Sequence, residues 1–487
     1  MSTENIIFIG VGLYVVLMVA VGAYASRKTH TATEFIVAGR NMPMFLCTAT
    51  IIATWFGGGT MMGVSGSAYD DGLLGVIADP FGASLALFLI GLFFARIVRR
   101  LKLLTFVEIV EHRFGRVAAT VTSIASIVSS IGWVGGMLVA FALVFSSLTG
   151  TPMHVGVIGG AVVVVVYTMI GGLWAVALTD LVQIVIIIVG IVVLFVVVLI
   201  DVGGWSAISP QLPENAFRLI PLENTTEQWL NYLRMWLIFG LADLPSQSLL
   251  GRAMAAKSER AAQNSFLLAG SGYFMFAMIP VTLGIIASVT MPNLSESEAV
   301  IPTLAIQHLH PIAVSIFVGA ILAAIMSTCD SSLLAVASLI SRNILPIVRP
   351  NPSDKLTLTV ARYTIPVVGA LAIFIALEAQ AVYDLIVDAN ILALCATTVP
   401  FLLAVWWKKA TRTGALAAMA VGFLTLLVTW TVAPELPGDL LGLGACLITI
   451  VVVSLLTQKS DPPRPARDVD GNPVELTNRF RAPTGGS

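Results

Sequence analysis

Side chains with oxygen atoms are concentrated in the segment AAIMSTCDSSLL. Ser327, Thr328, Asp330 and Ser331 fall within residues 327–331, and on a helix Ser327, Asp330 and Ser331 share one face. Hydroxyl and carboxylate oxygens are the ligands that hard cations prefer, a chemistry that sodium shares with calcium and magnesium. Membrane hydroxyls also commonly bond back to the preceding helical turn. Because several such side chains are grouped, the segment predicts a sodium site.

Acidic residues inside apolar segments form a second group of candidates. Asp180, Asp243, Asp330 and Asp388 each lie within a long apolar run. A charged side chain at the centre of a bilayer costs at least ~2.5 kcal/mol on insertion scales, so each is a functional candidate by default. Asp180 comes near the start of a long run and has a second interpretation as a helix cap.

Two apolar runs contain residues that disfavour a regular helix. The second run contains Gly57, Gly58 and Gly59 in TWFGGGTMMG, and each glycine is ~1 kcal/mol less favourable than alanine in a helix. The seventh run contains Pro245 in FGLADLPSQ, and proline removes a backbone donor. Inverted repeats place ligand sites at corresponding helix breaks near the midplane. Glycine alone can also serve close helix packing, but the matched pair favours two functional breaks.

These residues lie in a chain whose composition predicts a membrane protein. Its 487 residues are 57% hydrophobic and 11% charged, which is more apolar surface than a soluble core of this length can hide. A membrane span needs ~20 apolar residues. About thirteen runs meet this length, at residues 6–26, 43–68, 74–95, 118–149, 154–172, 176–200, 229–252, 263–290, 311–342, 358–379, 382–407, 414–433 and 438–457.

Basic residues divide the loops between the two sides of the membrane. If the N-terminus is outside, all of the 26 Lys and Arg residues except Arg218 and Arg234 lie on one side, and basic residues in short loops stay cytoplasmic. The opposite loops carry acidic residues such as Asp70 and Asp71. The pattern predicts a multi-pass protein of a plasma or bacterial inner membrane with a cytoplasmic C-terminus. Residues 461–487 are polar and rich in Pro and Gly, which predicts a disordered cytoplasmic tail.

Several function classes have no support in the sequence. The cysteines lie in apolar runs without paired spacing, which argues against a disulfide framework or a zinc site; they are Cys47, Cys329, Cys395 and Cys446. No His/Cys cluster, nucleophile motif or phosphate-binding loop is present, so the chain is not expected to be an enzyme. The net charge of −1 gives no indication of nucleic-acid binding, and none is expected.

The chain resembles the sodium:solute symporter family over nearly all of residues 1–460. Four motifs carry this resemblance, in order: ATWFGGGTMMGVSG at 53–66, YTMIGGLWAVALTDLVQ at 167–183, LPSQSLLGRAMAAKSERAA at 244–262 and AAIMSTCDSSLLAVASLISRNI at 323–344. Within the family they are most similar to the high-affinity choline transporter branch.

The resemblance implies an all-α membrane protein with a LeuT-like core. Two inverted five-helix repeats with broken helices would span residues 43–407. An extra N-terminal helix and a cytoplasmic loop (1–42) would precede the core. Two additional helices (408–460) and the tail (461–487) would follow it.

The resemblance also implies where sodium would bind. One ion would be held by the backbone carbonyls of Ala53 and Phe56 at the first break, together with the Ala324 carbonyl and the hydroxyls of Ser327 and Thr328. Some members hold a second ion closer to the cytoplasm. The corresponding residues here are Asp180, Ser327, Asp330 and Ser331, which would take a second sodium ion or a proton.

The solute position departs from the choline branch. Choline carriers surround a quaternary ammonium with aromatic rings, each worth roughly 0.5 to 2 kcal/mol. Trp55 and Trp133 hold two such positions, although they also have an interpretation as packing or interfacial residues, whereas Ser246 and Ala83 hold two others. Asp243 stands where that branch usually has a small residue and is able to pair with a protonated amine.

These residues predict a sodium symporter that imports a small amine-bearing or zwitterionic solute, such as an amino acid or a choline-like molecule, by alternating access. The predicted solute contacts are Trp55, Gly57, Thr60, Trp133, Asp243, Ser246 and Gln247. One alternative is a proton-coupled symporter of a monocarboxylate or pantothenate with Asp180 and Asp330 as the relay. A channel is a lesser alternative, because it needs a continuous polar pore.

Overall fold

The computed structural model describes residues 29–378 and 382–474, together with scattered positions between residues 12 and 27. All regular elements in this part of the chain are helical. The predicted first span at residues 6–26 lies largely outside the described residues. The longer helices are α3 (Met44–Trp55), α7 (Val107–Thr149), α8 (Met153–Asp201), α10 (Thr226–Gly240), α11 (Gln247–Ala255), α12 (Glu259–Thr290), α13 (Val300–His308), α14 (Pro311–Leu339), α16 (Asp354–Glu378), α17 (Val382–Ala393), α18 (Val399–Trp406), α19 (Arg412–Val432) and α20 (Gly438–Thr457).

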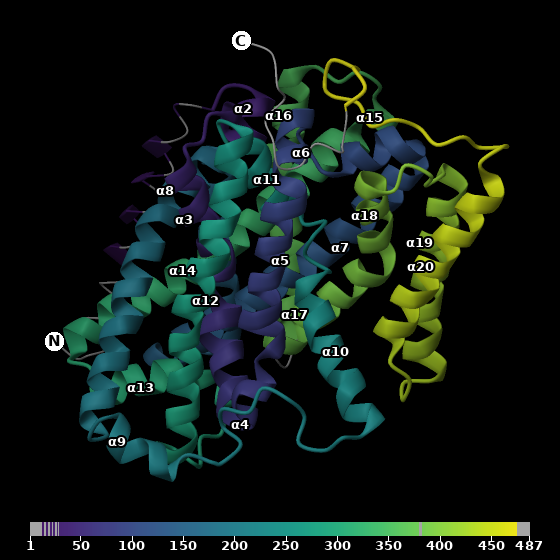
Figure 1. The fold of residues 1–487 in the computed structure, drawn as a ribbon. Coiled ribbons are helices and arrows are strands. Elements are labelled where there is room, and N and C mark those ends of the chain that lie inside the picture. Colours follow the sequence, from purple (N-terminus) through teal and green to yellow (C-terminus); the bar gives the residue numbers. More distant parts are fainter. Residues whose placement is uncertain are drawn as a thin grey trace.

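The helices run between two ends of the molecule that differ in charge. One end, which we name the acidic end, holds α4 (Ser65–Gly75) with Asp70 and Asp71 (Figure 1). The opposite end, the basic end, holds α2 (Ala32–Val37) and α6 (Ala95–Leu101), which carries Arg99 and Arg100. The charge asymmetry in the sequence is therefore also an asymmetry in space.

Among the described residues, nine helices are long and apolar enough to cross a membrane, or up to ten if a bent pair counts as one span. The prediction of about thirteen spans differs from this number partly because two predicted runs lie in one element, α8. At 1.5 Å per residue the 49 residues of α8 would extend about 73 Å, more than twice the ~30 Å hydrocarbon core of a bilayer.

Gly172 interrupts α8 near the boundary between those two runs. Its backbone is left-handed (φ 59°, ψ −160°), a conformation that glycine adopts without steric cost. A Cβ at this position would lie 2.7 Å from Cδ2 and 2.8 Å from the carbonyl oxygen of Phe35. The close approach of α2 therefore requires glycine here, where α8 divides into two membrane-length halves.

The helices of the second and seventh predicted spans are both interrupted. The second span is bent by 54° between α3 and the segment Gly59–Gly75, whose first part is the π-helical η2 (Gly59–Val64). In the seventh span α10 ends at Gly240 and α11 begins at Gln247. Turns occupy most of the intervening residues, which include Asp243 and Pro245.

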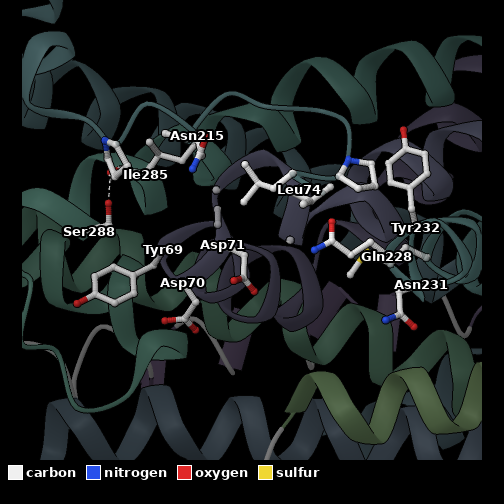
Figure 2. Close-up of a pocket in the computed structure, with 18 residues that line it drawn as sticks. Tyr69, Asp70, Asp71, Leu74, Asn215, Gln228, Asn231, Tyr232, Ile285 and Ser288 are labelled. Carbon is white, nitrogen blue, oxygen red and sulfur yellow. Dashed lines mark hydrogen bonds between the residues drawn. The ribbon is translucent and has the colours of Figure 1, made fainter. Parts of the chain in front are cut away.

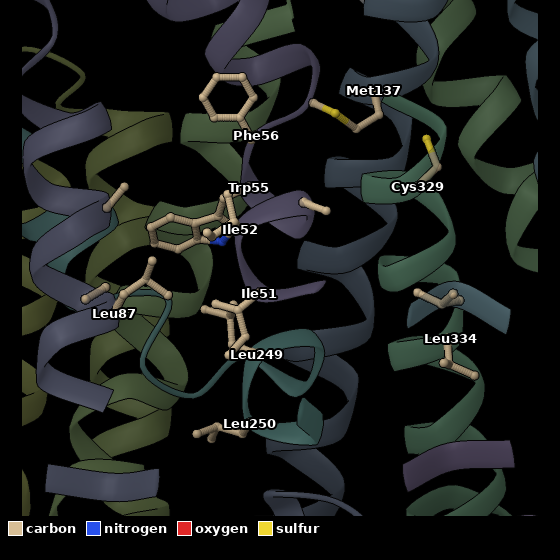
Figure 3. Close-up of a cluster of buried hydrophobic side chains, with 14 of the residues drawn as sticks. Ile51, Ile52, Trp55, Phe56, Leu87, Met137, Leu249, Leu250, Cys329 and Leu334 are labelled. Carbon is tan, nitrogen blue, oxygen red and sulfur yellow. The ribbon is translucent and has the colours of Figure 1, made fainter. Parts of the chain in front are cut away.

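The apolar core surrounds the first break. Ile51, Ile52 and Trp55 of α3 belong to one buried cluster with Leu87 of α5 (Ala83–Leu89) and Cys329 of α14 (Figure 3). Such a dense core resists volume changes and fixes the position of the helix ends that frame the break. The four cysteines are all free and buried.

The C-terminal part of the chain is attached to the core. Arg234 of α10 forms an ion pair of 2.7 Å with the buried Asp439 of α20, so one of the two exceptions to the charge rule has an acidic partner. Residues 461–474 correct the prediction of disorder, because the amide of Val469 donates to the Leu101 carbonyl (3.2 Å) and Arg113 donates to the Arg464 carbonyl. The rest of the tail lies outside the described residues.

Candidate functional site

The first break releases backbone groups from regular helical bonding. In a regular helix the N–H of Gly57 would donate to the carbonyl of Ala53. Here it donates to the carbonyl of Trp55 at 2.7 Å, which takes that donor away from Ala53. Phe56 leaves the helical region (φ −74°, ψ 59°), so its carbonyl turns out of the direction of the helix axis. The two carbonyls predicted to bind sodium thus lie at the point where helical bonding fails.

The break lies directly against α14. A Cβ at Gly57 would overlap Oγ1 of Thr328 and would lie 3.3 Å from the carbonyl oxygen of Ala324. The next residue is equally confined, since a Cβ at Gly58 would lie 2.7 Å from the Ala140 Cβ and 3.2 Å from Ile325. The glycines therefore allow the break to lie closer to α14 and α7 than any larger residue would permit.

The oxygens at this contact have the chemistry that a sodium ion requires. Thr328 is 2% exposed, and its hydroxyl donates to the Ala324 carbonyl at 3.3 Å. Ser327 is fully buried and its hydroxyl donates to Asp180. A hydroxyl that donates its proton keeps lone pairs for a cation. The Thr328 hydroxyl and the Ala324 carbonyl thus lie beside the break, and the neighbouring Ser327 hydroxyl is directed toward Asp180.

Asp180 lies inside α8 and not at a helix start, so its interpretation as a cap is wrong. Its carboxylate is fully buried and accepts hydrogen bonds from Thr50 of α3 and Ser327 of α14. Arg252 of α11 lies 3.6 Å from the same carboxylate. Three segments that are far apart in sequence therefore meet at Asp180.

Asp330 is the second acidic residue of this region. It is fully buried and accepts from the Tyr167 hydroxyl at 2.7 Å and from the Ser331 hydroxyl at 3.2 Å. Ser331 also accepts a hydrogen bond from Arg252 at 2.6 Å. The residues predicted for a second cation are thus linked by hydrogen bonds, and an arginine that charge counting assigned to the cytoplasmic side is part of the network.

A cavity lies beside the first break. It is lined by residues of α3, α7, α11, α14 and α17 and of the second break: Thr54, Trp55, Ser126, Ser129, Ser130, Trp133, Ala242, Asp243, Pro245, Ser246, Gln247, Ser248, Thr328, Ser332, Asn390 and Ala393. Its volume of about 50 Å³ is enough for a few waters and well below the roughly 300 Å³ of a small ligand pocket. A solute must therefore move side chains apart to enter.

Asp243 is the acidic group of this cavity. It is 8% exposed and accepts a hydrogen bond from the Asn390 amide at 3.3 Å. The other end of that amide accepts from the Trp133 indole at 2.9 Å. A carboxylate, an amide and an aromatic ring thus form one connected wall, which suits a solute with a cationic group next to an apolar surface.

A family model, the sodium:solute symporter family, matches residues 35–422. The chain belongs to this family. Its members are transporters and not enzymes, and they couple the uptake of small polar solutes to sodium. The matched region contains both breaks, the oxygen atoms of Ala324, Ser327 and Thr328, and the cavity.

Characterised relatives cover most of this symporter. It is 30% identical over 455 residues to high-affinity choline transporter 1 of Caenorhabditis elegans, covering 86% of this chain and 77% of the relative. It is 29% identical over 420 residues to the sodium/pantothenate symporter of Haemophilus influenzae, covering 83% of this chain and 85% of the relative. A solved sodium-coupled sialic acid symporter has the same fold, with a TM-score of 0.82 at 20% identity over 93% of this chain and 97% of that one. The symporter therefore has the fold of the LeuT-type transporters.

Two of the predicted solute contacts, Gly57 and Thr60, lie outside the lining of the cavity. Gly57 contacts α14 as described above. Thr60 is fully buried, and its hydroxyl lies 2.9 Å from the Trp55 carbonyl and 2.6 Å from the Tyr273 hydroxyl. Tyr273 in turn donates to Asp79 at 2.5 Å. Thr60 thus connects the first break to Tyr273 of α12 and does not face the cavity.

The remaining predicted contacts line the cavity but differ in their freedom to bind. Gln247 has both ends of its amide bound to backbone, at the Phe106 N–H (3.0 Å) and the Leu104 carbonyl (3.1 Å). Ser246 exchanges a hydrogen bond of 2.8 Å with Ser248. Gln247 therefore anchors the second break to the loop before α7, and Ser246 is the more available polar contact.

Sequence reasoning selected Asp388 and passed over Asp79 and Asn390. Asp388 is exposed, so it is not a buried site residue. Asp79 is 7% exposed and Asn390 is 1% exposed. Asp79 is the only charged residue in the apolar run 74–95, which is the signal that could have identified it. Asn390 lies in a run with several other polar residues, among them Asp388, and has no comparable signal.

A larger cavity of about 650 Å³ opens near the acidic end. Asp70 and Asp71 of α4 border it on one side, and Gln228 and Tyr232 of α10 border it on another (Figure 2). Because it lies between α4, α10 and α12, it forms a vestibule at the end where the first broken span finishes.

Proposed function

We propose that this symporter imports a small amine-bearing or zwitterionic solute together with sodium bound at the Gly57 break. The observation that carries the proposal is the double position of Thr328. Its hydroxyl oxygen is the atom that a Cβ at Gly57 would overlap, and the same residue lines the cavity that contains Asp243. Two sites that share a side chain influence one another's affinity.

The nature of the cavity favours a cationic group on the solute. Asp243 supplies a buried negative charge, and Trp55 and Trp133 supply rings that attract a cation. A carboxylate as the only charge on the solute would meet repulsion from Asp243. The relatives are named for choline, a quaternary amine, and for pantothenate, an organic acid. Asp243 favours an amine as the solute of this symporter. A zwitterion also fits, because its carboxylate is able to approach the sodium.

The proposed cycle starts with the acidic end open to the outside. Sodium binds the carbonyls at Ala53 and Phe56 and the oxygens at Ala324, Ser327 and Thr328. This binding joins α3 to α14 and completes the solute cavity next to it. The segments with the two breaks then rock against the remaining helices, so that both ligands leave at the basic end, as in other carriers built from inverted repeats.

We propose the remaining layout as follows. Residues 43–407 form the two inverted repeats, 1–42 an extra helix and its loop, and 408–460 two additional helices, with about thirteen spans in all. The basic end faces the cytoplasm and the N-terminus faces outward, because basic residues in short loops stay inside.

The proposal is tested with purified protein and a panel of amines, amino acids and organic acids in a thermal-shift screen, with sodium or potassium as the cation. We expect at least one amine-bearing compound to raise the midpoint in sodium and to have little effect in potassium. Proteoliposomes should then accumulate that compound along an inward sodium gradient. Accumulation that needs no sodium, or stabilisation by organic acids alone, would contradict the proposal.

Proton coupling is the second candidate, because Asp330 is buried with Tyr167 and Ser331 as its hydrogen-bond partners. Such a carboxylate can carry a proton between the two sides. Uptake in sodium-free buffer that an uncoupler abolishes would favour this candidate. Uptake that follows sodium and is indifferent to the uncoupler at a clamped membrane potential would favour sodium.

A further inference from the structure

Arg252 is a buried cation that the proposed cycle does not use. Its side chain is 2% exposed, and it lies in α11 just beyond the second break. A guanidinium is charged at any physiological pH and has five N–H donors. Burial of such a group requires a negative partner and well-placed acceptors. The residues around Arg252 therefore show which groups balance its charge.

The acceptors of Arg252 come from its own helix and from three others. Its Nε donates to the Thr50 hydroxyl of α3 at 3.1 Å, and its Nη2 donates to the Ser331 hydroxyl of α14 at 2.6 Å. Nη1 donates to the Ser248 carbonyl of its own helix. Nη2 also lies 3.6 Å from Oδ2 of Asp180 in α8.

These acceptors include the atoms that a second alkali ion would need. Asp180 and Ser331 belong to the predicted second cation site, and both already interact with the guanidinium. The Ser331 hydroxyl is engaged on both sides, since it accepts from Arg252 and donates to Asp330. An alkali ion binds to oxygen lone pairs, and N–H groups directed at those lone pairs exclude it. The guanidinium and a second sodium therefore compete for one position.

We propose that the Arg252 guanidinium permanently occupies the cation position beside Asp180, so that this symporter carries one sodium ion per cycle, at the Gly57 break. The proposal rests on the proposed sodium coupling and sets its stoichiometry. Because Arg252 is part of the chain, it balances Asp180 in every state of the cycle without being transported. Asp180 then joins α8 to the second broken span through a fixed ion pair.

The test counts sodium ions on the full-length protein in lipid nanodiscs, with ²²Na⁺ as the probe and no solute present. We expect the native protein to bind one ion per chain at saturation, and Thr328→Ala to need at least about tenfold more sodium to bind that ion. Two ions on the native protein, or one ion that Thr328→Ala binds with native affinity, would overturn the inference and leave sodium coupling intact. No sodium on the native protein would contradict the proposed function as well.

Arg252→Gln tests the exclusion itself. This substitution removes the charge and leaves room for an ion between Asp180 and Ser331, so we expect the count to rise from one ion to two. Arg252→Lys is the matched control, because it keeps a cation at the position, and its count should stay at one. A folded Arg252→Gln protein that still binds one ion refutes the proposal. If that variant does not fold, the measurements on the native protein and on Thr328→Ala decide the question.

Discussion

Gly57→Ala should weaken sodium binding while leaving the helices in place. The new methyl group would overlap Oγ1 of Thr328 and would approach the Thr328 Cβ to 3.2 Å and the Ala324 carbonyl to 3.3 Å. These are the atoms of α14 that sodium is proposed to join to the break. The methyl group therefore forces α3 and α14 apart at the ion's position.

The size of the effect follows from the cost of overpacking. Extra methyl groups in a packed core typically cost 1–3 kcal/mol, and every 1.4 kcal/mol is tenfold in a dissociation constant. Because the overlap is largest when the break and α14 are in contact, this cost falls on the sodium-bound form. We expect the sodium concentration for half-maximal stabilisation to rise by roughly 5- to 150-fold.

The assay is a thermal-shift titration with sodium at constant ionic strength, made up with potassium. Gly159→Ala in α8 is the matched control, because a Cβ there meets no atom within 4 Å, and its titration should be native. Gly57→Ala/Thr328→Ala relieves the overlap but lacks the hydroxyl, so its sodium response should stay weak. A native titration for Gly57→Ala would refute the proposed contact as the sodium site.

Four other substitutions probe three separate parts of the molecule. Ser327→Ala and Thr328→Ala should each raise the sodium concentration for half-maximal uptake by about tenfold or more, since each removes a proposed ligand worth ~1–3 kcal/mol; unchanged dependence in both would discredit the site. Asp243→Asn should reduce uptake of an amine-bearing solute at least roughly tenfold while the sodium titration without solute stays native, and equal loss of both would argue for a structural role. Arg234→Gln leaves the buried Asp439 without its ion pair and should destabilise the fold by ~1–3 kcal/mol. Arg116→Gln is the control, because the pair of Arg116 with Glu111 is largely exposed. We expect a lower unfolding midpoint for Arg234→Gln than for Arg116→Gln.

The sequence was most informative where the effect of a residue is local. Successive glycines at 57–59 and a proline at 245 disfavour a helix wherever they stand, and the structure has helix interruptions at both places. The hydroxyl stripe on α14 follows from helical periodicity alone. Such features need no knowledge of distant contacts.

Contacts between distant segments were not predictable in this way. Arg252 was counted as a cytoplasmic basic residue because charge counting assigns each residue by its place between runs. Its burial depends on Asp180 and Thr50, and Thr50 is 130 residues before Asp180 in the sequence. Gly172 was not selected either, since only the approach of Phe35 makes a glycine necessary there. A pairing across the chain leaves no pattern in a single sequence.

The contact between the two sites explains how binding of one ligand would change the affinity for the other. Trp55 has its carbonyl at the break, where it accepts the Gly57 N–H, and its side chain belongs to the residues that line the cavity. Thr328 likewise belongs to both. A cavity of about 50 Å³ must expand to hold a solute. This expansion moves Trp55 and Thr328, and Thr328 supplies a hydroxyl oxygen at the proposed cation position. If sodium already holds these residues in place, solute binding costs less conformational entropy. A coupling free energy of ~1–3 kcal/mol then requires only these shared residues and no path through the rest of the protein.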